Sequence, residues 1–123
     1  MKKLFTLILS VGCLLTFSSC NDKCASFEAR TGWKGKGSVL IIKNNNFKDK
    51  VEAHVTLIKP NDPTEYSGVR IIDAGNADEF GSLQIGSNIP VGGKVKVTIH
   101  DSDKTENYEL NFTGPAQFEV VEL

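Results

Sequence analysis

Apolar and polar residues alternate along most of the chain after residue 37, with the two-residue period of β-strands. The clearest run is residues 94–100 (KVKVTIH), in which three apolar side chains alternate with polar ones. A shorter alternation, residues 82–85 (SLQI), precedes this run. Residues 86–93 lie between the two runs and consist largely of turn-forming Gly, Asn, Ser and Pro. We therefore predict a β-hairpin over residues 80–101.

Five further runs predict strands. Residues 38–43 (SVLIIK) are apolar on both faces, which is typical of a strand in the middle of a sheet. The other four runs are residues 51–59, 66–73, 107–113 and 117–122. Turn-forming residues separate the runs, and no helical period persists for three turns after the first 19 residues. Seven short strands predict an all-β domain, a two-sheet sandwich, over residues 37–123.

Three of these segments share a pattern with a known family. The segments are residues 53–57 (AHVTL), 81–85 (GSLQI) and 89–97 (IPVGGKVKV). In this order they resemble the carboxypeptidase regulatory-like, transthyretin-like sandwich. The resemblance covers residues 37–99 and implies a structural or interaction module that has no catalytic residues. The turn at residues 44–50 lacks the usual Gly and Pro of that family, so an immunoglobulin-like strand order is the alternative.

The first 19 residues have the composition of a secretory signal. Two lysines are followed by an apolar run and then by two serines. The sequence Phe17-Ser18-Ser19-Cys20 resembles a bacterial lipobox, which implies that Cys20 is lipidated and becomes the first residue of the mature protein. Cleavage before Cys13 would leave an apolar stretch of only about seven residues, which is short for a signal. The other alternative is secretion without a lipid. We expect a signal peptide at residues 1–19.

Removal of this signal leaves 12 of the 14 basic residues against 15 acidic ones, a net charge of −3. A mildly acidic domain argues against nucleic acid as a partner, so the lipid at Cys20 would attach the protein to the membrane. Of the three cysteines, only Cys24 would remain as a thiol, and no internal disulfide could form. These features predict a lipid-anchored protein of the bacterial cell envelope, at the outer membrane.

Residues 20–36 are rich in Lys, Gly and small polar residues, which predicts a lipidated, flexible tether that contains Cys24. Trp33 lies in this segment. It could cover one end of the core, the interpretation that its position favours, or it could be an exposed surface for a sugar ring. Tyr66 is a second ring available to a ligand, whereas Tyr108 shares its face with apolar residues and is expected in the core.

Chemistry-bearing residues are few. His54 and His100 fall on the polar sides of their strands, and two imidazoles without a third ligand do not predict a metal site. Asp101, Asp103 and Glu106 are expected to cap a hairpin, because the rest of a calcium-binding loop pattern is absent. No catalytic motif is present, so we expect neither an enzyme nor a cofactor. The sequence thus predicts a non-catalytic structural or binding module whose partner is a protein or a glycan. The alternative is a small envelope hydrolase or metal-dependent enzyme with a site assembled from loops.

Overall fold

The computed structural model describes residues 3–8, 24–81, 84–85 and 88–123. Within this part of the chain there are nine strands and one short 3₁₀ turn, η2 (Trp33–Gly35). The strands are β1 (Lys3–Ile8), β2 (Ala25–Thr31), β3 (Ser38–Asn44), β4 (Val51–Ile58), β5 (Glu65–Ile72), β6 (Ala77–Phe80), β7 (Lys94–His100), β8 (Thr105–Gly114) and β9 (Gln117–Glu122).

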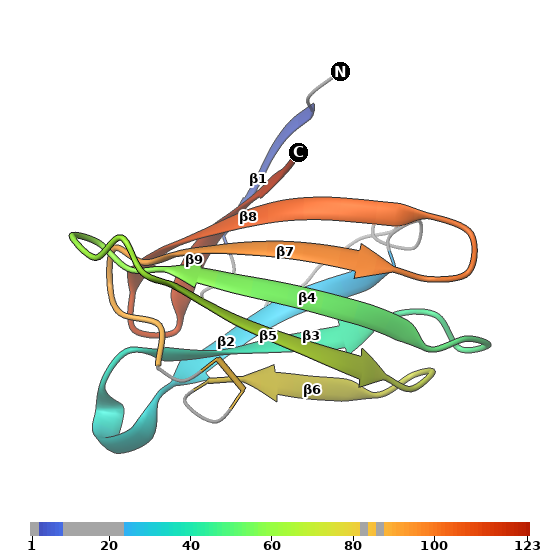
Figure 1. Cartoon of the computed structure of the whole chain (residues 1–123), viewed down its shortest axis with the longest axis horizontal. Coiled ribbons are helices and arrows are strands. Elements are labelled where there is room, and N and C mark those ends of the chain that lie inside the picture. The colour runs from blue at the N-terminus through green and yellow to red at the C-terminus, as the bar shows by residue number, and fades with distance from the viewer. Residues whose placement is uncertain (1–2, 9–23, 82–83, 86–87) are drawn as a thin grey trace.

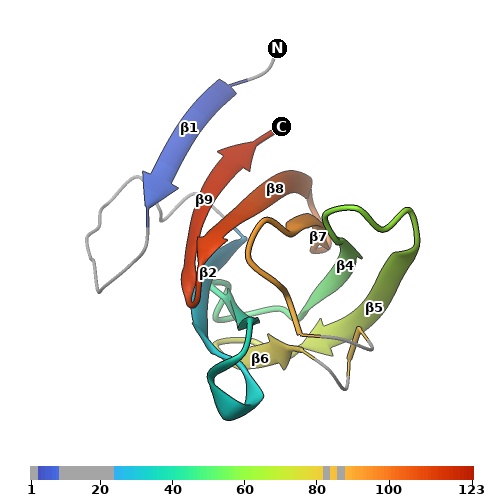
Figure 2. The same ribbon diagram turned by 90° about the vertical axis from the view of Figure 1, so that its left-hand side faces the viewer.

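The strands form two antiparallel sheets that pack face to face (Figure 1). The larger sheet has the order β1-β9-β8-β7-β4-β5, and the smaller sheet has the order β2-β3-β6. Figure 2 shows the two layers end-on, with η2 toward the viewer. The prediction of an all-β, two-sheet sandwich is confirmed. Six of the seven predicted strands are present with nearly the predicted bounds, and β3 is the central strand of its sheet as expected.

The predicted hairpin at residues 80–101 is wrong. β6 ends at Phe80 in the smaller sheet and β7 begins at Lys94 in the larger one, so the segment between them crosses from one sheet to the other. Ile85 is buried, but it lies in this crossover, where its N–H donates to the carbonyl of Gly81 at 3.0 Å. A Cβ at Gly68 of β5 would lie 2.4 Å from the carbonyl oxygen of Gln84, so the crossover passes closely over β5.

The predicted tether also requires correction, because residues 25–31 form strand β2. This strand pairs with β3 along its whole length, from Ala25 opposite Asn44 to Thr31 opposite Ser38. Phe27 is only 5% exposed, and its ring packs edge-on against Tyr108 with the ring centroids 4.9 Å apart. The folded domain therefore begins well before residue 37. Cys20 lies outside the described residues.

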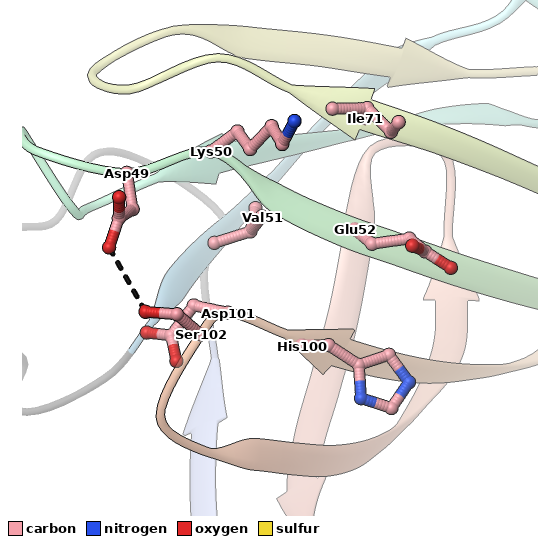
Figure 3. Close-up of a pocket in the computed structure, with 8 residues that line it drawn as sticks. All are labelled: Asp49, Lys50, Val51, Glu52, Ile71, His100, Asp101 and Ser102. Atoms are coloured by element: carbon pink, nitrogen blue, oxygen red, sulfur yellow. Dashed lines mark hydrogen bonds between the residues drawn. The ribbon is translucent and has the colours of Figure 1, made fainter.

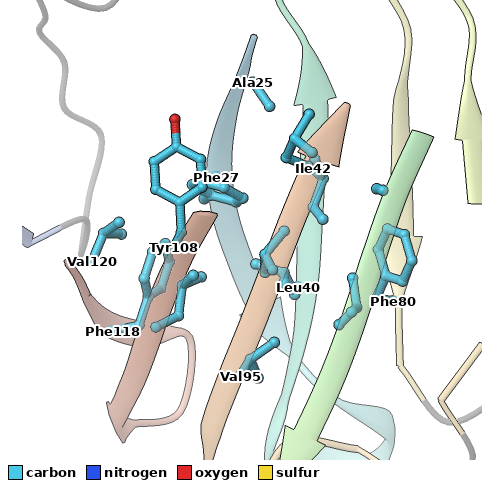
Figure 4. Close-up of a cluster of buried hydrophobic side chains, with 14 of the residues drawn as sticks. Ala25, Phe27, Leu40, Ile42, Phe80, Val95, Tyr108, Phe118 and Val120 are labelled. Carbon is cyan, nitrogen blue, oxygen red and sulfur yellow. The ribbon is translucent and has the colours of Figure 1, made fainter. Parts of the chain in front are cut away.

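The core lies between the two sheets and is built from the inward-facing side chain of every second strand residue (Figure 4). Tyr108 belongs to this cluster, as the sequence predicted. Each fully buried Val, Leu, Ile or Phe stabilises the fold by about 1.5 to 3 kcal/mol. The largest fully buried side chains come from both sheets and, for Ile89, from the segment between β6 and β7: Phe80, Phe118, Leu40, Ile42, Leu57, Ile89, Ile99, Leu110, Val51, Val55, Val95 and Val97.

β1 extends the larger sheet at one edge, where it pairs with β9. Its residues, Lys3–Ile8, fall inside the segment that the sequence predicts to be a signal peptide. The other eight strands form a five-stranded and a three-stranded sheet without it. Removal of the first 19 residues would therefore leave both layers of the sandwich in place.

Candidate binding surfaces

Trp33 is displayed on the turn between β2 and β3. Its side chain is 73% exposed, so the expectation that it covers the core is wrong. The turn is closed by a hydrogen bond from the Gly32 N–H to the carbonyl of Gly37 at 3.0 Å. Lys34 and Gly35 have positive φ values of 58° and 72°. Glycine adopts this left-handed conformation without steric cost, which accounts for Gly35 in the turn. The ammonium of Lys34 lies 4.5 Å from the centroid of the Trp33 ring, within the range of a cation–π contact.

Neighbouring segments hold this turn in place. The N–H of Ser38, which begins β3, donates to the carbonyl of Ile89 at 2.7 Å, and the N–H of Ile89 donates back to the carbonyl of Ser38 at 3.0 Å. The amide of Asn88 donates to the carbonyl of Lys36 at 3.4 Å. The exposed side chain of Val91 follows directly after this braced segment. Because the backbone beneath Trp33 is fixed, a partner that contacts the indole would order little additional chain.

Tyr66 lies near the start of β5, at the same end of the sandwich as η2 (Figure 1). Its hydroxyl donates to Asp62 Oδ2 at 3.1 Å, and this hydrogen bond is the main reason why the pKa of Tyr66 is raised. The ammonium of Lys59 lies 4.6 Å from the centroid of the Tyr66 ring. Among the described residues no ring contact joins Tyr66 to Trp33, so the structure does not bring the two predicted ligand-binding residues together.

His54 and His100 lie side by side on the outer face of the larger sheet, as the alternation predicted. They come from the neighbouring strands β4 and β7, and their ring centroids are 5.4 Å apart with an interplanar angle of 89°. Nε2 of His54 contacts Oε2 of Glu52, and Nδ1 of His100 lies 2.9 Å from Oγ1 of Thr105. In the part of the chain that the structure describes, no group of three or more His, Cys, Asp or Glu side chains is arranged to hold a metal ion.

A hollow of about 250 Å³ opens beside His100, between the start of β4 and the end of β7 (Figure 3). The hydroxyl of Ser102 donates to Asp49 Oδ2 at 3.1 Å across one side of it. The lining is mixed in character and consists of Asp49, Lys50, Val51, Glu52, Ile71, His100, Asp101 and Ser102. The sequence did not indicate this hollow, since its residues come from three separate segments.

The acidic residues after β7 are used by the fold itself. Oδ1 of Asp101 accepts the N–H groups of Asp103 and Lys104 at 2.8 and 2.9 Å, and the first of these bonds is the main reason why the pKa of Asp101 is lowered. Oε1 of Glu106 accepts the N–H of Cys24 at 3.0 Å and the hydroxyl of Tyr108 at 2.6 Å. These carboxylates therefore close the turn between β7 and β8 and fix the start of β2.

Cys24 is buried, with 2% of its surface exposed. The prediction that it lies in a flexible tether is therefore wrong. Its thiol donates to Asp101 Oδ2 at 3.4 Å. Burial, together with the negative charge of Glu106, raises the pKa of the Cys24 thiol to about 12. Because the thiolate is the reactive form of cysteine, this residue is a poor nucleophile at neutral pH.

Comparisons with protein-family models, with curated proteins and with solved structures found no match to this chain. Among the described residues, none of the elements is a helix of the length and apolarity needed to cross a membrane. The resemblance to the carboxypeptidase regulatory-like sandwich thus stays a prediction, and the described residues of its second segment, 81, 84 and 85, do not lie in a strand.

Proposed function

We propose that this protein is a lipoprotein of the bacterial cell envelope that is anchored through Cys20 and acts as a non-catalytic binding module. The export and anchoring part of the proposal is supported by the succession of lysines, apolar residues and serines before Cys20. The binding part is supported by a rigid sandwich whose loops display side chains to solvent, an arrangement that many binding proteins share.

The exposure of Trp33 is the observation that carries the binding proposal. A tryptophan side chain that is 73% exposed leaves a large apolar surface in water. Its turn is closed by backbone hydrogen bonds and braced by Ile89, so the indole does not fold back onto the core. An indole offers a flat apolar face and one N–H donor, which suits the face of a sugar ring or an apolar side chain of a protein. The partner is accordingly a glycan or a protein of the envelope.

The experiment is a pull-down from envelope extract with three forms of the unlipidated domain: the wild type, Trp33→Ala and Phe47→Ala. Phe47 is the matched control, because it is 79% exposed and lies in a different loop. An aromatic residue at the centre of an interface typically contributes about 2 kcal/mol or more, which is roughly a 30-fold change in affinity. We expect Trp33→Ala to lose the partner and Phe47→Ala to keep it. Equal recovery by all three forms would remove Trp33 from the binding surface.

A second candidate is a small envelope hydrolase that works at the hollow beside His100. The contact between Glu52 and His54 favours it, since a carboxylate that orients an imidazole is a common arrangement in acid–base catalysis. Turnover of an envelope polymer by the purified domain, abolished by His54→Ala and by His100→Ala, would support this candidate. Binding of the same polymer without turnover would support the binding module.

A further inference from the structure

We propose that one end of the sandwich rests on the lipid surface, with Phe47 as its apolar contact, and that the Trp33 turn points away from the membrane. This end consists of the β3–β4 loop, the β5–β6 turn and the β7–β8 turn, which lie together at the right of Figure 1, whereas η2 lies at the left. The proposal rests on the proposed lipidation of Cys20.

The length of chain between the lipid and the fold supports this orientation. Only four peptide links separate Cys20 from Cys24, and an extended chain spans at most about 3.6 Å per residue, so the lipid attachment lies within about 14 Å of Cys24. Cys24 is fixed at the membrane-facing end by three hydrogen bonds: its N–H donates to Glu106, its thiol donates to Asp101, and its carbonyl accepts the N–H of Asn45. The lipid therefore holds this end of the domain close to the bilayer.

Trp33 is separated from this end by the length of β2. The strand runs from Ala25 beside Cys24 to Thr31 beside the turn, and six steps of about 3.3 Å make this distance about 20 Å. The pairing of β2 with β3 over all seven residues keeps the strand extended. When the Cys24 end of the domain faces the bilayer, Trp33 is therefore at the end away from the membrane, where an envelope partner can reach it.

Phe47 has the chemistry that a membrane-facing loop needs. Its side chain is 79% exposed. The loop beneath it is rigid, because Oδ1 of Asn46 accepts the N–H groups of Lys48 and Asp49 at 2.8 and 3.0 Å, and the carbonyl of Asn46 accepts the N–H of Gly75 at 3.0 Å. A Cβ at Gly75 would lie only 3.2 Å from the Phe47 ring, so the ring is held over the β5–β6 turn.

The residues around Phe47 suit the lipid headgroup layer rather than a dry interface. An aromatic ring inserts among headgroups, and lysines such as Lys48 can reach the phosphates while their stems stay apolar. Asp49, Asp73 and Asp103 lie at the same end, so a strong attraction to anionic lipids is not expected. The contact should therefore form on neutral phosphatidylcholine, held by the lipid anchor and the apolar ring together.

The single tryptophan of the chain makes this orientation measurable. The processed lipoprotein is reconstituted into phosphatidylcholine vesicles with or without brominated acyl chains, which quench indole emission at short range. Three forms are compared: the wild type, Trp33→Phe with Phe47→Trp, and Trp33→Phe with Val69→Trp. Val69 is an exposed residue on the side of the sandwich, in the middle of β5, and serves as the matched control.

We expect the brominated lipid to quench most of the emission from position 47 and to leave the emission from positions 33 and 69 unchanged. Quenching at position 33, or at position 69, would overturn the orientation, because the domain would then be inverted or lie on its side. Unquenched emission at all three positions in vesicle-bound protein would overturn it as well, since the domain would stand off the bilayer. If the wild type fails to stay with the vesicles, as expected for Cys20→Ala, the anchor is wrong and the orientation falls with it.

Discussion

Phe27→Ala is the substitution that tests most sharply whether residues 25–31 belong to the fold. Phe27 is 5% exposed and packs against Tyr108 in the core, although its local sequence resembles a tether. Truncation of a buried Phe to Ala typically costs about 3 to 5 kcal/mol, because both the transfer free energy and the packing around the resulting cavity are lost. The free energy of unfolding of a small domain is about 5 to 15 kcal/mol, so this loss would remove a large fraction of it.

The assay is urea unfolding of the unlipidated chain that starts at residue 20, followed by far-ultraviolet circular dichroism. Trp33→Ala is the matched control, since it removes a larger aromatic ring from the same predicted tether but from an exposed position. Substitutions at exposed positions usually change the free energy of unfolding by less than about 0.5 kcal/mol. A loss of about 3 kcal/mol or more for Phe27→Ala and almost none for Trp33→Ala would support the packing of β2. Equal, small effects of both substitutions would refute it.

Three further predictions concern the core and the turn after β7. Val97→Asp places an unpaired carboxylate between the sheets and should unfold the domain, whereas Lys96→Asp on the outer face should leave the dichroism spectrum unchanged. The Cys24 thiol should react with Ellman's reagent only after denaturation. Because its pKa is raised from 9.0 to about 12 by folding, its contribution to stability is complete below pH 9 and falls by at most about 1.4 kcal/mol per pH unit above it, a loss that Cys24→Ala should reduce in alkaline urea titrations. The pKa of Asp101 is lowered by folding, so its contribution is present above the ordinary carboxyl pKa of about 3.9 and is lost as the pH falls below that value. Asp101→Asn should therefore reduce the stability at pH 7 and flatten its decrease in acid, and an unchanged acid titration would contradict this role.

Much of the fold can be predicted from local alternation, because a strand with one solvent-exposed face has alternating apolar and polar residues. β4 and β7 were predicted in this way with nearly their observed bounds. The prediction of a hairpin at residues 80–101 was wrong because the alternation in its first half contains only two apolar residues. One of them, Ile85, is buried in a crossover, and burial in a loop and burial in a strand leave the same short pattern. The true strand β6 has a sequence, ADEF, with one buried residue, which gives no periodic signal.

The tether was mispredicted for a different reason. Residues 25–31 (ASFEART) contain few apolar side chains, so their role depends on contacts that are distant in sequence. Phe27 meets Tyr108 of β8, and the N–H of Cys24 meets Glu106. The only local signal is the alternation of Ala25, Phe27 and Ala29 with polar residues, which the tether prediction did not use.

The candidate binding surfaces could be predicted only in part from the sequence. The outward positions of His54 and His100 follow from strand alternation, and the structure places them on one face. The exposure of Trp33 does not follow from its sequence, because the same glycine-rich turn could have folded the indole onto the core. The hydrogen bonds that brace it involve Ile89, which belongs to a segment that the sequence assigned to a hairpin turn.

The mass of the processed protein is the most direct test of whether Cys20 is the lipidated first residue. The full chain is expressed in a bacterial host, extracted from the membrane fraction and measured intact by mass spectrometry, with Cys20→Ala prepared in parallel. We expect a chain that begins at Cys20 and carries additional acyl mass, and Cys20→Ala should lack this mass and leave the membrane fraction. A wild-type protein with the mass of an unmodified chain, or one that begins at a residue other than Cys20, would contradict this expectation.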